Sequence, residues 1–100
     1  MVLFFSLAGC DSEQELSKAE STLFAMNTYM TFTAYGEQAQ TALDEVEVLI
    51  EKLESLWSVT GEESEIYRAN RSSGQTVSVS EETEELISFA LEMAQKTDGA

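Results

Sequence analysis

The chain has 100 residues, with 19 Asp or Glu, 5 Lys or Arg, no His and 1 Cys, so its formal net charge is −14. This charge excludes broad binding to nucleic acid, which needs clustered basic side chains. Without His and with a single Cys, the chain can hold neither a His/Cys zinc site nor a Ser-His-Asp or Cys-His catalytic arrangement.

Residues 1–10 carry no charge and are mostly apolar, like the end of a secretion signal. They end in Leu7-Ala8-Gly9-Cys10, which resembles the bacterial lipobox, in which the cysteine is lipidated. We therefore expect a signal-peptide remnant and a protein anchored through Cys10 in the cell membrane, on its extracytoplasmic side. No Lys or Arg precedes Cys10, so we expect the true start to lie upstream. The alternative is a buried N-terminal strand that ends at an incidental cysteine.

Residues 11–21 are polar and acidic, and their composition is typical of a solvated tether. From Thr22 to Tyr35, β-branched and aromatic residues predict a strand, or a hairpin broken near Asn27, that stops at Gly36. Residues 30, 32 and 34 alternate with residues of the opposite face. One face of this segment should therefore pack on a helix.

Residues 37–57 carry the strongest helical pattern, since apolar residues recur at steps of three and four positions. This stripe contains Ala39, Ala42, Leu43, Val46, Leu49, Ile50, Leu53, Leu56 and Trp57. Most of the glutamates lie off the stripe. The helix should pack its apolar face on the sheet that contains the first strand.

The segment from residue 58 to residue 74 is a polar loop with a short helix over 64–70, N-capped by Ser64. A short strand is predicted over 75–79. Ser80 should then cap a second long helix, whose first turns contain four glutamates, as the helix dipole favours. Leu86, Phe89, Ala90 and Met93 form its apolar stripe, and Gly99 should be its C′ residue.

These elements predict an α+β fold in which two long amphipathic helices pack on a mixed or antiparallel sheet. The chain stops directly after a helix-terminating Asp-Gly, and its few strands lack partners. We therefore expect residues 22–100 to be the N-terminal portion of a larger domain whose C-terminal half is missing.

Four segments in a fixed order resemble one family. They are Phe24-Ala25-Met26-Asn27-Thr28, the loop 58–70 with Ser64-Glu65-Ile66 and Asn70, the strand 77–79 feeding the capped helix, and Thr97-Asp98-Gly99-Ala100. Together, behind a lipobox, they resemble the ApbE family of FAD:protein FMN transferases. The resemblance implies a fold related to the T-fold.

The resemblance further implies that FAD is the substrate and that Mg²⁺ polarises its pyrophosphate. FMN is then transferred to a threonine of an acceptor flavoprotein subunit of an electron-transport complex, and AMP leaves. Family members bind the metal and carry out catalysis mostly through their C-terminal half. We therefore expect no catalytic or metal-binding residue in this chain, which alone should be inactive.

Three residues match family positions that contact FAD. Met26 matches the methionine of a Met-Gly-Thr motif, although Asn27 replaces the glycine. Thr60 stands where many members carry a tyrosine that contacts FAD, and Ala100 matches the start of a Gly-Ala-(Phe/Met)-Asp segment. Trp57 and Phe89 are interpreted as packing residues.

Two other functions stay open. The protein could be a non-catalytic surface lipoprotein that binds a ligand or a partner. It could also be a relative that binds FAD without transferring FMN, or only hydrolyses it. The sequence beyond Ala100 and the products formed from FAD would separate these alternatives.

Overall fold

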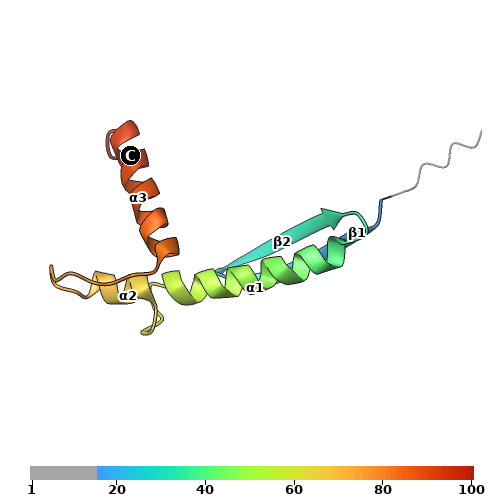
Figure 1. The fold of residues 1–100 in the computed structure, drawn as a ribbon, viewed down its shortest axis with the longest axis horizontal. Coiled ribbons are helices and arrows are strands. Elements are labelled where there is room, and N and C mark those ends of the chain that lie inside the picture. The colour runs from blue at the N-terminus through green and yellow to red at the C-terminus, as the bar shows by residue number, and fades with distance from the viewer. Residues whose placement is uncertain (1–15) are drawn as a thin grey trace, which may run out of the picture.

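The computed structural model describes residues 16–100, which form an antiparallel hairpin and three helices (Figure 1). The fold is α+β, as predicted from the sequence. The elements in chain order are β1 (Lys18–Ala25), β2 (Thr28–Tyr35), α1 (Ala39–Trp57), α2 (Glu65–Asn70) and α3 (Glu81–Lys96). The predicted lipobox with Cys10 lies outside the described residues.

The hairpin pairs β1 with β2 from Lys18 opposite Tyr35 to Ala25 opposite Thr28. The alternation predicted for β2 is confirmed, since Met30, Phe32 and Ala34 are more buried than the residues between them. β1 begins four residues before the predicted boundary at Thr22. The last residues of the predicted acidic tether therefore belong to a strand, because backbone pairing with β2 extends to Lys18.

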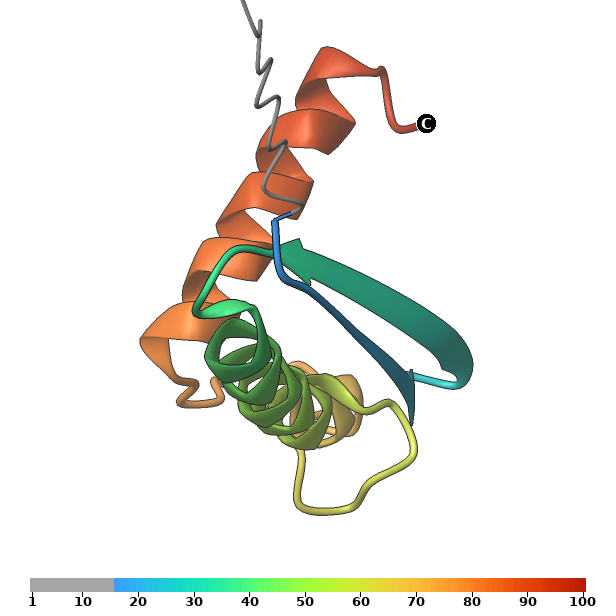
Figure 2. The ribbon, with the colours of Figure 1, turned by 90° about the vertical axis from the view of Figure 1, so that its right-hand side faces the viewer.

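Helix α1 packs along one face of the hairpin, as the end view in Figure 2 shows. Its buried and half-buried apolar residues recur at alternating steps of four and three, as the sequence predicts for one face of a helix. They are Ala39, Leu43, Val46, Ile50, Leu53 and Trp57, and Leu56 beside Trp57 is half-buried as well. Ala42 and Leu49, also assigned to the stripe, are exposed because they lie at its solvent edge.

Helix α2 begins where the sequence predicts, after Ser64. The Ser64 hydroxyl accepts a hydrogen bond from the Tyr67 backbone N–H at 3.0 Å, which is an ordinary N-cap. Ser64 is itself buried, with 2% of its surface exposed, and its hydroxyl donates to the Ser58 carbonyl. The cap thereby closes the loop that joins α1 to α2.

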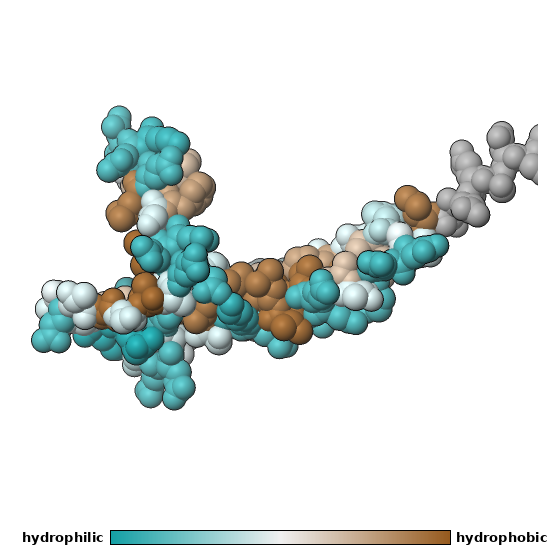
Figure 3. Space-filling model, viewed as in Figure 1, coloured by the Kyte–Doolittle hydropathy of each residue, from teal (hydrophilic) through white to brown (hydrophobic). Residues whose placement is uncertain are grey.

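Helix α3 is the predicted second long helix, but it does not lie on the sheet. It projects from the end of α1 and α2, and all residues from 84 to 100 are exposed (Figures 1 and 3). The interpretation of Phe89 as a packing residue was therefore wrong, since 61% of its surface is exposed. The apolar stripe of α3 has no covering element among residues 16–100.

Two smaller predictions were also wrong. Residues 75–79 form no strand, because no other strand of the described chain lies beside them to supply backbone partners. At the end of α3, the residue after the Thr97 cap is Asp98, with φ 53°, so the predicted C′ position of Gly99 is shifted by one. Within residues 16–100, no helix is both long and apolar enough to cross a membrane.

Candidate functional site

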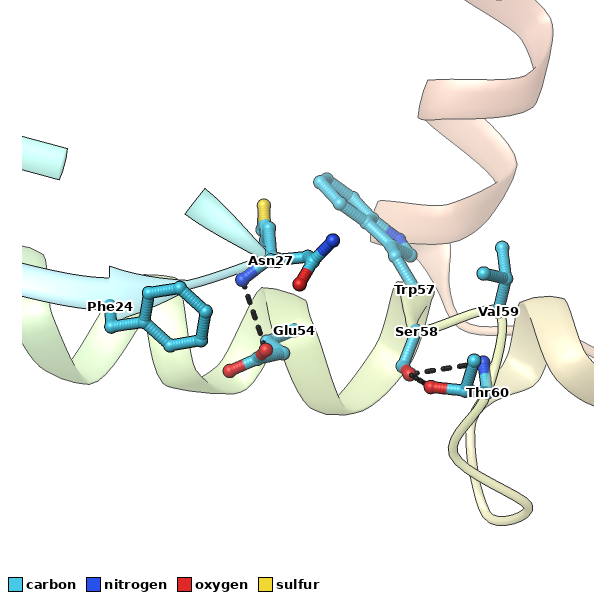
Figure 4. Close-up of a pocket in the computed structure, with 8 residues that line it drawn as sticks. Phe24, Asn27, Glu54, Trp57, Ser58, Val59 and Thr60 are labelled. Atoms are coloured by element: carbon cyan, nitrogen blue, oxygen red, sulfur yellow. Dashed lines mark hydrogen bonds between the residues drawn. The ribbon is translucent and has the colours of Figure 1, made fainter. Parts of the chain in front are cut away.

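A cavity of about 620 Å³ lies where the hairpin turn meets the C-terminal end of α1 (Figure 4). Its volume falls within the usual range for small-molecule sites, about 300–1,000 Å³. Its wall is formed by the end of β1 with the turn that follows, by the last turn of α1 and by the loop after α1. The lining residues are Phe24, Met26, Asn27, Glu54, Trp57, Ser58, Val59 and Thr60.

The hairpin turn is a two-residue loop formed by Met26 and Asn27. Both have left-handed backbone angles, with φ 51° and 58°, as a type I′ turn requires. Asn is one of the residues that tolerate this conformation, whereas Met rarely adopts it. The sequence predicted a strand, or a hairpin broken near Asn27; the structure confirms the hairpin and places Met26 in its turn.

Glu54 fixes the turn against α1. One of its carboxylate oxygens accepts a hydrogen bond from the Met26 backbone N–H at 3.0 Å (Figure 4). A second glutamate two helical turns earlier, Glu47, accepts a hydrogen bond from the Ser21 hydroxyl in β1. These two glutamates lie at the edge of the stripe and bind the hairpin, a role that the sequence pattern did not indicate.

The loop after α1 is organised by Ser58. Its hydroxyl oxygen accepts a hydrogen bond from the Gly61 N–H at 2.9 Å and lies 3.3 Å from the Thr60 hydroxyl. A Cβ atom at Gly61 would lie 3.2 Å from that same oxygen, so the close approach favours glycine. This arrangement holds Thr60 at the rim of the cavity.

Trp57 forms the wall between the cavity and α3. Its indole N–H donates to the Thr83 hydroxyl oxygen at 3.2 Å, and Thr83 is fully buried. The interpretation of Trp57 as a packing residue was incomplete, because its ring also lines the cavity. No sequence pattern indicated this role, since Trp57 belongs to the apolar stripe like its neighbours.

Behind Trp57, the carboxylate of Glu65 accepts three hydrogen bonds. They come from the Ser80 backbone N–H at 2.7 Å, the Ser80 hydroxyl at 2.8 Å and the Thr83 hydroxyl. The hydrogen bond from Thr83 is the main cause that holds the pKa of Glu65 below its usual range. Burial raises this pKa, and the two hydrogen bonds from Ser80 lower it further. Ser80 begins α3 as predicted, but its hydroxyl binds Glu65 and makes no cap bond within its own helix.

The structure brings together two of the three residues predicted to contact FAD. Met26 and Thr60, which are 34 positions apart, line the same cavity. Ala100 lies beyond α3, at the other end of that helix from the cavity (Figure 1). Their contact with FAD remains a prediction for all three.

The cavity wall combines apolar side chains with a few polar groups, as sites for small organic ligands commonly do. Its apolar side chains come from Phe24, Met26, Trp57 and Val59, and its polar groups are an amide and two hydroxyls besides Glu54. No Lys or Arg lines it. In residues 16–100 there is no group of three or more acidic or Cys side chains placed to hold a metal ion.

Comparison with known proteins identifies one family. The model of the ApbE family matches residues 26–100, which begin at the hairpin turn and include α1, α2 and α3. No curated protein and no solved structure matches significantly.

Proposed function

The chain belongs to the ApbE family, and on that basis we propose that the intact protein is an FAD:protein FMN transferase. The family match carries this proposal. In the reaction, the hydroxyl oxygen of an acceptor threonine attacks the phosphorus of the FMN half of FAD. A phosphoester bond forms, the pyrophosphate bond breaks, AMP leaves, and the hydroxyl proton passes to solvent.

Within this proposal, the cavity between the hairpin turn and α1 receives an uncharged ring of FAD. Two observations support this assignment. Met26 and Thr60, which match FAD-contacting positions of the family, share this cavity. Among residues 16–100, the one ionisable side chain that lines it is Glu54, whose negative charge would oppose a pyrophosphate.

The Mg²⁺ that the family implies has no assigned ligand here, because residues 16–100 contain no group of three or more possible metal ligands. We propose that metal binding and catalysis rest on residues of the intact protein outside 16–100, and that the present chain is inactive alone.

The test is to incubate the intact protein with FAD, Mg²⁺ and a flavoprotein acceptor subunit, and to separate the products. AMP together with FMN attached to the acceptor, lost when EDTA is added, is the expected result. AMP with free FMN would overturn transfer in favour of hydrolysis. Absence of AMP would overturn enzymatic activity and favour a binding lipoprotein.

We also propose that Cys10 carries a lipid that anchors the protein on the extracytoplasmic face of the membrane. The Leu7-Ala8-Gly9-Cys10 motif supports this proposal. Cys10→Ser should abolish labelling by a radioactive fatty acid and move the protein from the membrane to the soluble fraction. Ser6→Ala, which keeps the four-residue motif, is the control. Equal labelling of the Cys10→Ser variant would refute the anchor.

A further inference from the structure

One chain of hydrogen bonds connects the cavity wall to the start of α3. The Trp57 indole N–H donates to Thr83, the Thr83 hydroxyl donates to Glu65, and the Ser80 N–H and hydroxyl donate to the same carboxylate. The Ser80 and Thr83 hydroxyl oxygens also lie 3.2 Å apart, so the two hydroxyls are linked to each other as well as to the Glu65 carboxylate. It joins residues from the end of α1, the start of α2 and the first turn of α3.

Burial gives this chain its importance. Thr83 has no exposed surface, and Glu65 has only 9% of its surface exposed. A buried hydroxyl that loses its partner pays the full desolvation cost, so the network favours one arrangement of all its members. The indole ring can turn away from the cavity wall only if its N–H gives up the Thr83 oxygen.

We propose that Thr83 and Glu65 are positioning residues that hold the Trp57 ring at the cavity wall, and so shape the site for its ring ligand. This proposal rests on the proposed function for the identity of the ligand, but not for the positioning itself. Neither residue lines the cavity. Thr83 and Glu65 therefore act on the cavity through Trp57. The same hydrogen bonds couple the shape of the cavity to the position of α3.

Trp57 is the only tryptophan, so its fluorescence reports on this side chain alone. In the full chain, Thr83→Val keeps the shape of the side chain but removes the acceptor of the indole N–H. We expect a lower fluorescence anisotropy and stronger quenching by acrylamide than in the wild type. Thr83→Ser keeps the hydroxyl and should restore both values. Ser55→Ala, at an exposed position on the same helix, is the matched control.

Glu65→Gln gives a second test if Thr83→Val does not fold, as circular dichroism would reveal. The glutamine amide has one acceptor oxygen in place of two. Its NH₂ group must therefore face either the Ser80 N–H or the two hydroxyls, and at least one hydrogen bond of the carboxylate is lost. We expect the same increase in Trp57 mobility. Unchanged anisotropy and quenching in a folded variant of either kind would overturn the positioning role.

Binding of FAD, followed by flavin fluorescence, forms the second arm. Loss of one hydrogen bond corresponds to about a fivefold weaker Kd in Thr83→Val, with Thr83→Ser near the wild type. Failure of the wild type to bind FAD would count against the proposed function alone, since the tryptophan measurements would still decide the positioning. Equal Kd values in both threonine variants, with FAD bound, would overturn the effect on the site.

Discussion

Two adjacent residues at the tip of the hairpin decide how the cavity is built. Met26 and Asn27 both adopt left-handed angles, which bring β1 and β2 together with a two-residue turn. The sequence placed a break near Asn27 but did not indicate that Met26 shares the turn, because Met is uncommon there. The Glu54 carboxylate, which binds the Met26 N–H, is the tertiary contact that no local pattern contains.

The left-handed angle at Asn27 predicts a clear difference between substitutions. Asn27→Val should lower the free energy of unfolding by about 1–2 kcal/mol, because a β-branched side chain clashes in this conformation. Asn27→Gly should change it by less than about 1 kcal/mol. Urea denaturation followed by circular dichroism measures both values. Equal stability of the two variants would contradict the turn.

At Glu65, the lowered pKa predicts a pH dependence of stability. Because the folded-state pKa is depressed, the stabilisation is complete above the usual carboxyl pKa of about 4.3 and is lost as pH falls through the lower folded value. The free energy of unfolding of the wild type should therefore exceed that of Glu65→Gln at neutral pH, and this difference should shrink in acid.

Urea denaturation between pH 7 and pH 3 measures this difference. Glu84→Gln controls for the loss of one charge in the first turn of α3, since Glu84 is exposed and makes no side-chain hydrogen bond with Glu65. A constant difference between the wild type and Glu65→Gln across this range would show that the carboxylate charge has no part in the contact.

At the scale of elements, the sequence pattern located α1, α2 and α3 within two residues at each end. It succeeded because each helix carries a repeated apolar stripe or a recognisable N-cap. It failed for residues 75–79, where alternating valines suggest a strand but no partner strand lies alongside. A strand is defined by pairing between distant segments, so a local pattern cannot establish it.

The packing of α1 on the hairpin predicts a contrast along one helix. Leu43 is 3% exposed, so Leu43→Ala should lower the free energy of unfolding by about 2–5 kcal/mol. Val48 is 67% exposed on the opposite side, and Val48→Ala should change it by less than about 0.5 kcal/mol. Denaturant unfolding measures both. Similar losses in the two variants would contradict the orientation of α1.

At the scale of the whole molecule, the sequence predicted the α+β class and part of the site, but not the arrangement. Met26 and Thr60 could be selected by resemblance, whereas Trp57 looked like any other member of an apolar stripe. The position of α3 depends on Glu65 and Thr83, which are too far apart in sequence for periodicity to link them. Only the folded chain shows that these residues meet.

The extended placement of α3 predicts uneven local stability. The helix contacts the other elements through its first turn, and all its residues from 84 onward are exposed. A helix with little tertiary packing is only marginally stable in water. Backbone amides of residues 87–96 should therefore exchange with deuterium faster than those of residues 43–53. Mass spectrometry of the full chain measures this, and equal protection of the two segments would contradict it.

The carboxylate that binds the N-cap residue of α3 belongs to Glu65 of α2, and this contact has a consequence for engineering the chain. The hydrogen bonds between Glu65 and Ser80 hold the start of α2 against the start of α3, and neither residue lies in the middle of the loop that joins the two helices. Doubling a flexible loop costs only about 0.6 kcal/mol of closure entropy. The exposed turn at Ser73 and Gly74 is therefore a suitable place to insert an epitope tag or a small fluorescent reporter without disturbing the helices on either side.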